Sequence, residues 1–429
     1  MARAEADNRT DAPPNVAPQS EPRRLNSMHT SLGRHERRNR GWRFAVAMVG
    51  ALAAVCLLWA GSLHAEPYFT VRDGYKCSKC HVNKTGGHAR TDYAKVYMET
   101  RNSMSSGGAG STGVDYGHGR LSDAFSLSAD LRAVAQSEHN NTEATQWQFG
   151  RPSSCESCHT ANSGGGKRAE IYAQFQPLPG KASIVMTENL LPQPSTREVY
   201  GLLEFDRLNG YLKVGKFRMP TALHNTFDDP FYHGAVDVGS TDEVGLEAVR
   251  GDGLEMGIEP GPYSVSLSIT NPADYAAVLK GKREVLNAYA VGRLGLVGLM
   301  YYVDPRTQTE NRTFMGLYGG ASIGRVTGLV EVDQINTPNV GLGSSTDQQA
   351  LLAEVNFLLS RGQNIKWQYE AFDPNTSAEK DIRDRNSLIY EPFITPYLQF
   401  RGGVRRWAGP RQTPGANGTT VFAEVHLIY

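Results

Sequence analysis

From Leu121 to the end of the chain, segments alternate between apolar and polar side chains, and this pattern constrains the fold more than any other feature. A β-strand turns successive side chains to opposite faces, so each segment has one apolar face. The alternation predicts sixteen strands, at residues 122–136, 168–177, 182–189, 197–206, 209–217, 242–257, 262–270, 285–293, 295–303, 312–321, 325–334, 348–360, 364–372, 386–394, 397–407 and 419–429. The sequence therefore predicts an all-β fold.

The gaps between these strands alternate in length. Short gaps occur at 178–180, Leu208, 361–363 and 395–396, and long ones at 138–167, 218–241, 271–284, 335–347, 373–385 and 408–418. Short turns at one end and long loops at the other are typical of outer-membrane barrels, which have an even number of strands in single-chain bacterial forms. We therefore expect a transmembrane antiparallel β-barrel of about sixteen strands over residues 121–429, with its short turns in the periplasm. A sandwich or propeller also has many short strands but does not explain the loop lengths.

The last strand has the clearest alternation. Apolar residues occupy every second position at Val421, Ala423, Val425, Leu427 and Tyr429, between Phe422, Glu424, His426 and Ile428. An edge strand of a soluble protein can also alternate, but the terminal aromatic residue favours a barrel. Polar strand residues expected to line the lumen include Glu204, Arg250, Glu331, Glu354 and Arg401.

The first 65 residues have the features of an export signal. The apolar stretch 44–63 follows a basic run, which predicts a signal peptide cleaved after Ala65; an uncleaved membrane anchor is the alternative. The chain has 44 basic and 44 acidic residues, and residues 1–65 contain nine Arg and five acids, which leaves 35 basic and 39 acidic residues in 66–429. This balance indicates no nucleic-acid partner, and contact with outer-membrane lipid would have to be made by strands.

Two Cys-x-x-Cys-His motifs carry the chemistry of the chain. They are Cys77-Ser-Lys-Cys80-His81 and Cys155-Glu-Ser-Cys158-His159. Two thiols at this spacing can each form a thioether to one porphyrin, and the adjacent His can bind the iron as proximal ligand. Of the five cysteines, Cys56 lies in the expected leader and the other four all belong to these motifs. We expect two covalently attached haem c groups; a zinc site, a redox dithiol and a disulfide are the alternatives.

The two motifs share the residues that follow them. A hydroxyl residue, a Gly-Gly pair and an Arg recur at the same offsets, as Thr85-Gly86-Gly87 with Arg90 and as Ser163-Gly164-Gly165 with Arg168. Glycine lets the backbone pass close to a porphyrin, and Arg suits a haem propionate. The sequence therefore predicts two copies of one haem-holding unit.

The strand map places the two units at different ends of the barrel. Residues 66–120 form an N-terminal c-type haem segment, with a short helix at 92–104 and a Gly/Ser linker at 105–119. The first haem is therefore expected in the periplasm or in the lumen, which it would plug from the periplasmic side. The second motif lies in the first long loop, 138–167, on the expected external side.

A few residues of the sequence are candidates for the distal ligand of each haem iron. His118 precedes the first strand and suits the first haem, whereas His139 lies in the same loop as the second motif. Met98 and Met104 are alternatives for the first haem. His88 lies seven residues after His81, but Gly166 occupies the same place in the second unit, so this position supplies no distal ligand shared by the two units. The stretch 224–233 contains two His and two Asp; it can bind a divalent metal or constrict the pore.

A haem motif followed by a porin-like barrel resembles the fused cytochrome–porin family of outer-membrane iron oxidases. Cys77, Cys80 and His81 match the single haem site of that family, and the second motif departs from it. The barrel also resembles phosphate-selective and related porins at 127–132 and 214–220. The resemblance implies electron transfer between an extracellular donor, often ferrous iron, and periplasmic c-type cytochromes.

We therefore expect a diheme outer-membrane cytochrome that carries electrons between periplasmic cytochromes and an extracellular donor or acceptor such as iron. No residue is assigned a catalytic role, although ferrous-iron oxidation is compatible with this reading. Two other classes remain open: a solute porin whose haems sense redox state, and a periplasmic diheme enzyme such as a peroxidase.

Overall fold

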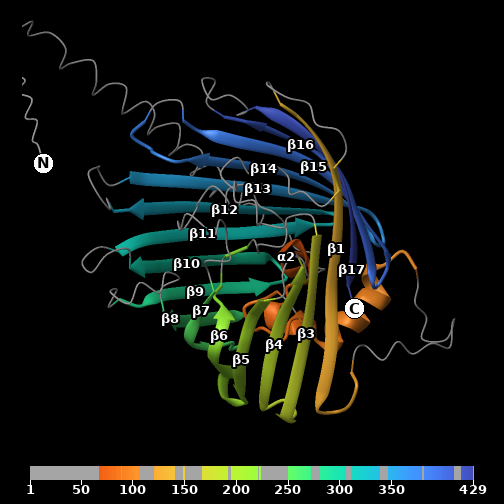
Figure 1. The fold of residues 1–429 in the computed structure, drawn as a ribbon, viewed down its shortest axis with the longest axis vertical. Coiled ribbons are helices and arrows are strands. Elements are labelled where there is room, and N and C mark those ends of the chain that lie inside the picture. Colours follow the sequence, from red (N-terminus) through yellow and green to blue (C-terminus); the bar gives the residue numbers. More distant parts are fainter. Residues whose placement is uncertain are drawn as a thin grey trace, which may run out of the picture. The chain divides into compact units, whose positions relative to one another are not determined.

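The computed structural model describes residues 67–87, 89–105, 120–140, 148–149, 167–191, 195–220, 222–223, 250–271, 281–305, 311–338, 346–378, 381–409 and 417–428. All described strands belong to one antiparallel sheet that curls around a lumen (Figure 1). The strands are β1 (Phe125–Asn140), β2 (Gln148–Phe149), β3 (Lys167–Leu178), β4 (Ala182–Leu191), β5 (Ser195–Phe205), β6 (Gly210–Arg218), β7 (Arg250–Ile258), β8 (Tyr263–Thr270), β9 (Arg283–Gly292), β10 (Gly295–Pro305), β11 (Asn311–Ile323), β12 (Val326–Thr337), β13 (Thr346–Ser360), β14 (Gln363–Asp373), β15 (Arg383–Thr395), β16 (Leu398–Ala408) and β17 (Gly418–Ile428).

The sheet closes on itself between its first and last strands. β1 pairs with β17 from Asp130 opposite Ile428 to Asn140 opposite Gly418. Its other edge pairs with β3, while the two-residue β2 pairs with β1 further along. The described residues therefore form sixteen long strands in a closed barrel, as predicted, with bounds within a few residues of those expected. The beginning of the predicted strand 242–257 lies outside the described residues.

Turns of two to four residues join the strands at one end of the barrel. They are residues 179–181, 206–209, 259–262, 293–294, 324–325, 361–362 and 396–397, and the second includes the 3₁₀ turn η3 (Arg207–Asn209). β1 begins and β17 ends at this same end, since Phe125 pairs with Phe175 near the first of these turns. By the rule for such barrels this is the periplasmic end.

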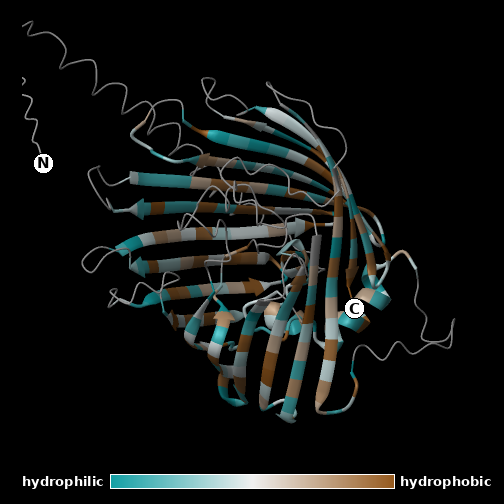
Figure 2. Ribbon diagram, viewed as in Figure 1, coloured by the Kyte–Doolittle hydropathy of each residue, from teal (hydrophilic) through white to brown (hydrophobic). Residues whose placement is uncertain are grey.

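The barrel is apolar outside and polar inside. Along β17 the side chains of Val421, Val425 and Leu427 are exposed on the outer face, while Glu424 and His426 are buried. The exposed outer residues of other strands include Leu299, Tyr301, Met315, Leu317, Leu388 and Val404. Figure 2 shows apolar residues alternating with polar ones along the strands. An apolar outer surface of this extent is suited to lipid.

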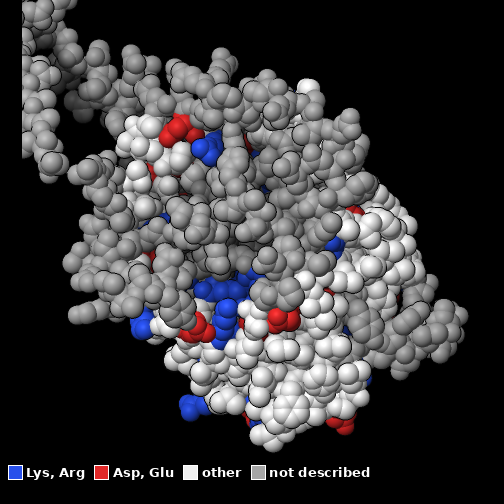
Figure 3. Space-filling model, in the orientation of Figure 1, with Lys and Arg blue, Asp and Glu red and all other residues white. Residues whose placement is uncertain are grey.

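Charged side chains fill much of the lumen wall. Four of the five polar residues predicted for the lumen, Arg250, Glu331, Glu354 and Arg401, are buried there. Lys213 on β6 and Glu255 on β7 form an ion pair with an N···O distance of 2.5 Å and both side chains fully buried. Figure 3 shows Lys and Arg side chains in a hollow at the centre of the view, beside a largely uncharged outer wall. Charged side chains thus line the interior, which suits polar contents such as water and hydrophilic solutes.

A short helical segment lies inside this lumen. It contains α2 (Pro67–Asp73), α3 (Cys77–Cys80), α4 (Asp92–Tyr97) and the π-helical turn η1 (Met98–Asn102). Thr91 caps α4, because its Oγ1 accepts a hydrogen bond from the Ala94 amide (3.3 Å). The last two elements match the helix predicted at 92–104. We call the described residues 67–87 and 89–105 the plug. Among the described residues, no helix has the length and hydropathy needed to cross a membrane.

The plug is held at the periplasmic end of the barrel. α2 packs against β9, β10, β11 and β12 (Figure 1). At its far end Arg361 donates to the Glu99 carbonyl (3.0 Å) and the Tyr397 hydroxyl donates to the Glu99 carboxylate (2.8 Å). Both partners lie in or beside periplasmic turns. The prediction that the N-terminal segment lies in the periplasm or in the lumen is confirmed.

Candidate cofactor site

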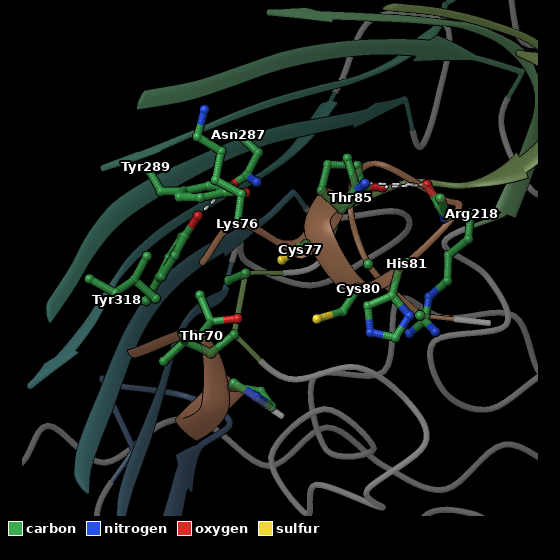
Figure 4. Close-up of a pocket in the computed structure, with 18 of the residues that line it drawn as sticks. Thr70, Lys76, Cys77, Cys80, His81, Thr85, Arg218, Asn287, Tyr289 and Tyr318 are labelled. Carbon is green, nitrogen blue, oxygen red and sulfur yellow. Dashed lines mark hydrogen bonds between the residues drawn. The ribbon is translucent and has the colours of Figure 1, made fainter. Parts of the chain in front are cut away.

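One helical turn of the plug displays both cysteines and the histidine of the first motif. The amide of His81 donates to the Cys77 carbonyl (3.0 Å) and closes α3. Residues three apart on a helical turn lie on the same side, so the thiols of Cys77 and Cys80 are neighbours. Figure 4 shows the Cys77 and Cys80 side chains on this turn, followed by His81.

The loop that follows the motif folds back onto it. His81 and Arg90 form an isolated antiparallel bridge, and the amides of Val82 and Thr91 donate to the carbonyls of Ala89 and Cys80 (both 3.0 Å). These bonds fix the loop that carries the predicted glycine pair. Gly86 and Gly87 have φ values of 98° and 82°, which favour glycine.

A cavity opens beside this turn inside the barrel. Together with the solvent space at its mouth it measures about 880 Å³. Its walls come from the plug, from the residues at and after the end of β6, and from β9, β10 and β11; they include Cys77, Cys80, His81, Arg218, Met219 and Tyr289. The three residues expected to hold the first haem therefore lie together at one cavity.

The glycine at position 86 lies against the side chain of Cys77. A Cβ atom at Gly86 would lie 3.5 Å from Cys77 Cβ and 3.6 Å from its Sγ. A side chain at residue 86 would therefore take up space next to the thiol. Two thiols and an imidazole on one turn, with a glycine beside them and a cavity in front, are a donor set that fits covalently bound haem.

The two thiols of this motif are separate and neutral in this structure. Cys77 and Cys80 are not joined by a disulfide. Among the described residues, no group of three or more His, Cys, Asp or Glu side chains is placed to hold a metal ion. Burial raises the pKa of Cys77 to about 11 and that of Cys80 to about 12, so both thiols are neutral near pH 7.

Polar contacts tie the motif to the periplasmic turn between β7 and β8. Ser78 Oγ donates to the Glu259 carboxylate and Lys76 Nζ donates to the Glu259 carbonyl, both at 2.6 Å. Burial raises the pKa of Glu259, and the contacts with Ser78 and Lys76 act against it. On the other side Lys84 pairs with Glu204 of β5, one of the residues predicted to face the lumen.

The structure separates several other predicted residues from this cavity. Met98 is buried and its Sδ accepts from the Asn102 side chain (3.5 Å), whereas Met104 is exposed; neither lines the cavity. Met98 begins η1 and Met104 lies two residues beyond its end, so the described cavity is lined by neither of these candidate distal ligands. Arg90 does not line the cavity either; burial lowers its pKa, and Asp130 and Cys80 act in the opposite direction.

The remaining predicted ligands fall elsewhere. His139 is exposed on β1, opposite Thr419 of β17 and away from the cavity. His88, His118, the second motif from Cys155 through Cys158 to His159, and the stretch 224–233 lie outside the described residues.

Sequence reasoning missed the cavity residues that the barrel itself supplies. Arg218 and Met219 come from the end of β6, and Asn287, Tyr289 and Tyr318 from β9 and β11. The segment 214–220 had been noted only for its resemblance to porins. Alternation along β6 gives no such signal, because it puts Arg218 on the face opposite Lys213 and Phe217, whereas all three are buried. The contact between this part of the wall and the plug spans more than 100 residues and leaves no local pattern.

Comparison with known proteins supports the fold. No protein-family model matches the sequence, and a comparison with curated proteins finds no match. Among solved structures, the anion-selective porin from Comamonas acidovorans matches with 10% identity over 71% of this chain and 99% of that one, at a TM-score of 0.56. OmpT, an outer membrane protein of Vibrio cholerae folded in vitro, matches with 13% identity over 72% and 98%, at a TM-score of 0.51. The chain is a porin-like outer-membrane β-barrel.

This porin-like barrel confirms the predicted fold and outer-membrane location. At such low identity the likeness concerns the fold alone. The matched structures cover about the length of the barrel, so the plug and its cavity are features to be explained from this chain's own residues.

Proposed function

We propose that this porin-like barrel is a c-type cytochrome that carries electrons across the outer membrane between periplasmic cytochromes and an extracellular donor or acceptor such as iron. The observation that carries the proposal is the turn Cys77–His81, which is held inside the lumen beside a cavity. A barrel that only lets solutes diffuse through it does not need a Cys-x-x-Cys-His turn inside its lumen.

The chain's own residues have distinct roles at this site. Cys77 and Cys80 would attach the porphyrin, and His81 would bind its iron. Haem c supplies a one-electron redox centre whose potential depends on the ligands and surroundings of the iron. Lys76 and Arg218 line the cavity and suit the propionates, since cations pair well with carboxylates. The closed barrel wall keeps the site away from lipid.

The position of the cavity also favours a conduit. The plug reaches it from the periplasmic turns, and the described residues 219–220 and 222–223 enter the lumen from the opposite end of β6. There the Leu223 amide donates to Glu331 of β12 (3.1 Å). The apolar layer of an outer-membrane barrel is about 25 Å tall. A centre within the lumen shortens the distance to the second motif, which the sequence assigns to the loop between β1 and β3.

A solute porin with redox-sensing haems is the second candidate. The charged lumen wall favours it, because a polar interior suits small hydrophilic solutes. The plug argues against it, since its contacts with the barrel lie where solutes would pass. A periplasmic peroxidase has less support, because the apolar outer face of the closed barrel does not suit a soluble enzyme.

Electron transfer across a sealed bilayer tests the proposal. The purified chain would be placed in liposomes that enclose a reduced dye, and a ferric complex that cannot cross the bilayer would be added outside. We expect dye oxidation and equivalent iron reduction, at a rate lost when Cys77 and Cys80 are both replaced by Ala. Each ferric ion reduced takes one electron from the dye.

Leakage is the main confounding process. Liposomes with the doubly substituted barrel serve as the matched control, because they retain the same wall. Equal rates for the two proteins, or dye escape without iron reduction, would favour the porin reading and contradict electron transfer.

A further inference from the structure

A methionine of the barrel reaches the cavity of the first motif. Met219 follows β6 directly, is 1% exposed and lines the cavity together with His81. Its Sδ accepts a hydrogen bond from Thr270 Oγ1 of β8 (3.4 Å). Met219 is thus part of the wall of the cofactor site, and the Thr270 hydroxyl contacts its sulphur atom.

The backbone around Met219 is held in place. Pro220 follows it, which restricts Met219 to extended conformations. On the preceding side, the Arg218 amide donates to the Glu198 carboxylate of β5 (2.5 Å). On the following side, the Leu223 amide donates a hydrogen bond to the Glu331 carboxylate across the lumen. A side chain anchored at both flanks is suited to act as a fixed ligand.

Other potential ligands at the described cavity wall are less suitable. Cys77 and Cys80 would be used for attachment. Lys76 and Tyr289 must lose a proton before they can bind iron, whereas a thioether sulphur binds without losing one. The Tyr318 hydroxyl donates to Asn287 (2.6 Å). His81 is the sole imidazole among the described lining residues.

We infer that Met219 is the distal ligand of the haem held by Cys77, Cys80 and His81. This inference rests on the proposed function, since it requires haem at the first motif. It replaces the methionines that the sequence suggested, Met98 and Met104, with one that the barrel supplies. Because His/Met ligation raises the potential of a c-type haem, the first centre would favour donors of comparatively high potential.

Optical spectroscopy of single-site variants tests the inference. The second haem would first be removed by replacing Cys155 and Cys158 with Ala, so that one haem remains. The ferric protein should then show the weak long-wavelength band that arises from sulphur-to-iron charge transfer. We expect Met219→Leu to abolish this band, and Met98→Leu and Met104→Leu to leave it unchanged.

A redox titration provides the second readout. Met219→His should restore a six-coordinate haem with a lower midpoint potential, which a purely structural role for Met219 would not produce. Variants are compared only when heat-modifiable gel mobility shows a folded barrel. Met219→His also serves if Met219→Leu does not fold.

The outcomes separate the two claims. Covalent haem without the sulphur band, or a band that survives in Met219→Leu, would overturn the inference and leave the cytochrome proposal intact. Absence of covalent haem in the starting protein would overturn both.

Discussion

At the scale of single residues, burial decides how the groups of this chain behave. Cys80 is buried and Cys77 is half-buried at the cavity, and burial raises the pKa of both thiols, so they resist ionisation. Lys213 and Glu255 are fully buried, and the barrel tolerates the two buried charges because they form an ion pair. The hydroxyls of Tyr211 and Ser268 also donate to Glu255, at 3.0 and 2.7 Å. The thiols and the buried ion pair lead to separate predictions.

The haem-free folded chain should be unreactive toward thiol reagents at moderate pH. A thiol is neutral below its pKa, so Cys77 and Cys80 become reactive only as the pH rises toward about 11 and 12. At pH 8 we expect alkylation on the order of 100-fold slower than at an exposed thiol. The measurement is the alkylation rate against pH, in a variant with Ser at Cys155 and Cys158. A rate that levels off by pH 9 would contradict the burial of these thiols.

Replacing Lys213 should destabilise the barrel. Lys213→Met leaves the Glu255 carboxylate buried without its cation, and we expect a loss of about 3 kcal/mol in the free energy of unfolding. Lys181→Met is the matched control: Lys181 pairs with Asp206 at the surface, where such a pair contributes about 0–1 kcal/mol. Urea unfolding in detergent checks both. Similar losses for the two variants would show that the buried pair has no special role.

At the scale of elements, the strands follow from local pattern and the site does not. Alternation within each segment suffices to predict β17, and turn residues between segments suffice for most strand bounds. From the sequence, the plug could be assigned only to the periplasm or to the lumen entered from that side. Its position in the lumen depends on contacts such as the hydrogen bond from Ser78 to Glu259. These two residues are 181 positions apart, so no local sequence pattern indicates the contact. For the same reason Met219 was not recognised as a residue of the first site.

Removal of the plug should open the barrel to ions. A variant that lacks residues 67–105 keeps the strands but loses the helices that fill the periplasmic end of the lumen. We expect its single-channel conductance in planar bilayers to be several-fold higher than that of the intact chain. The variant with Gln at Glu204 and Glu259 should lie between them, because it weakens two contacts of the plug. Equal conductance of the intact and shortened chains would mean that the plug does not restrict the lumen.

At the scale of the whole molecule, the chain combines a membrane-spanning wall with a cofactor turn inside it. The barrel supplies an apolar exterior, a polar lumen and part of the cavity, and the plug supplies the two thiols and the imidazole. Neither part forms the site alone, since Arg218, Met219 and Tyr289 come from the wall. Electron transfer by this barrel therefore requires haem bound at the turn Cys77–His81.

The most direct test is the intact mass of the chain isolated from the outer membrane, together with a haem stain of the denatured protein. We expect two covalent haems in the natural chain and one after Cys77 and Cys80 are replaced by Ala. A chain that carries no covalent haem, or that keeps its full haem content in this variant, would contradict this expectation.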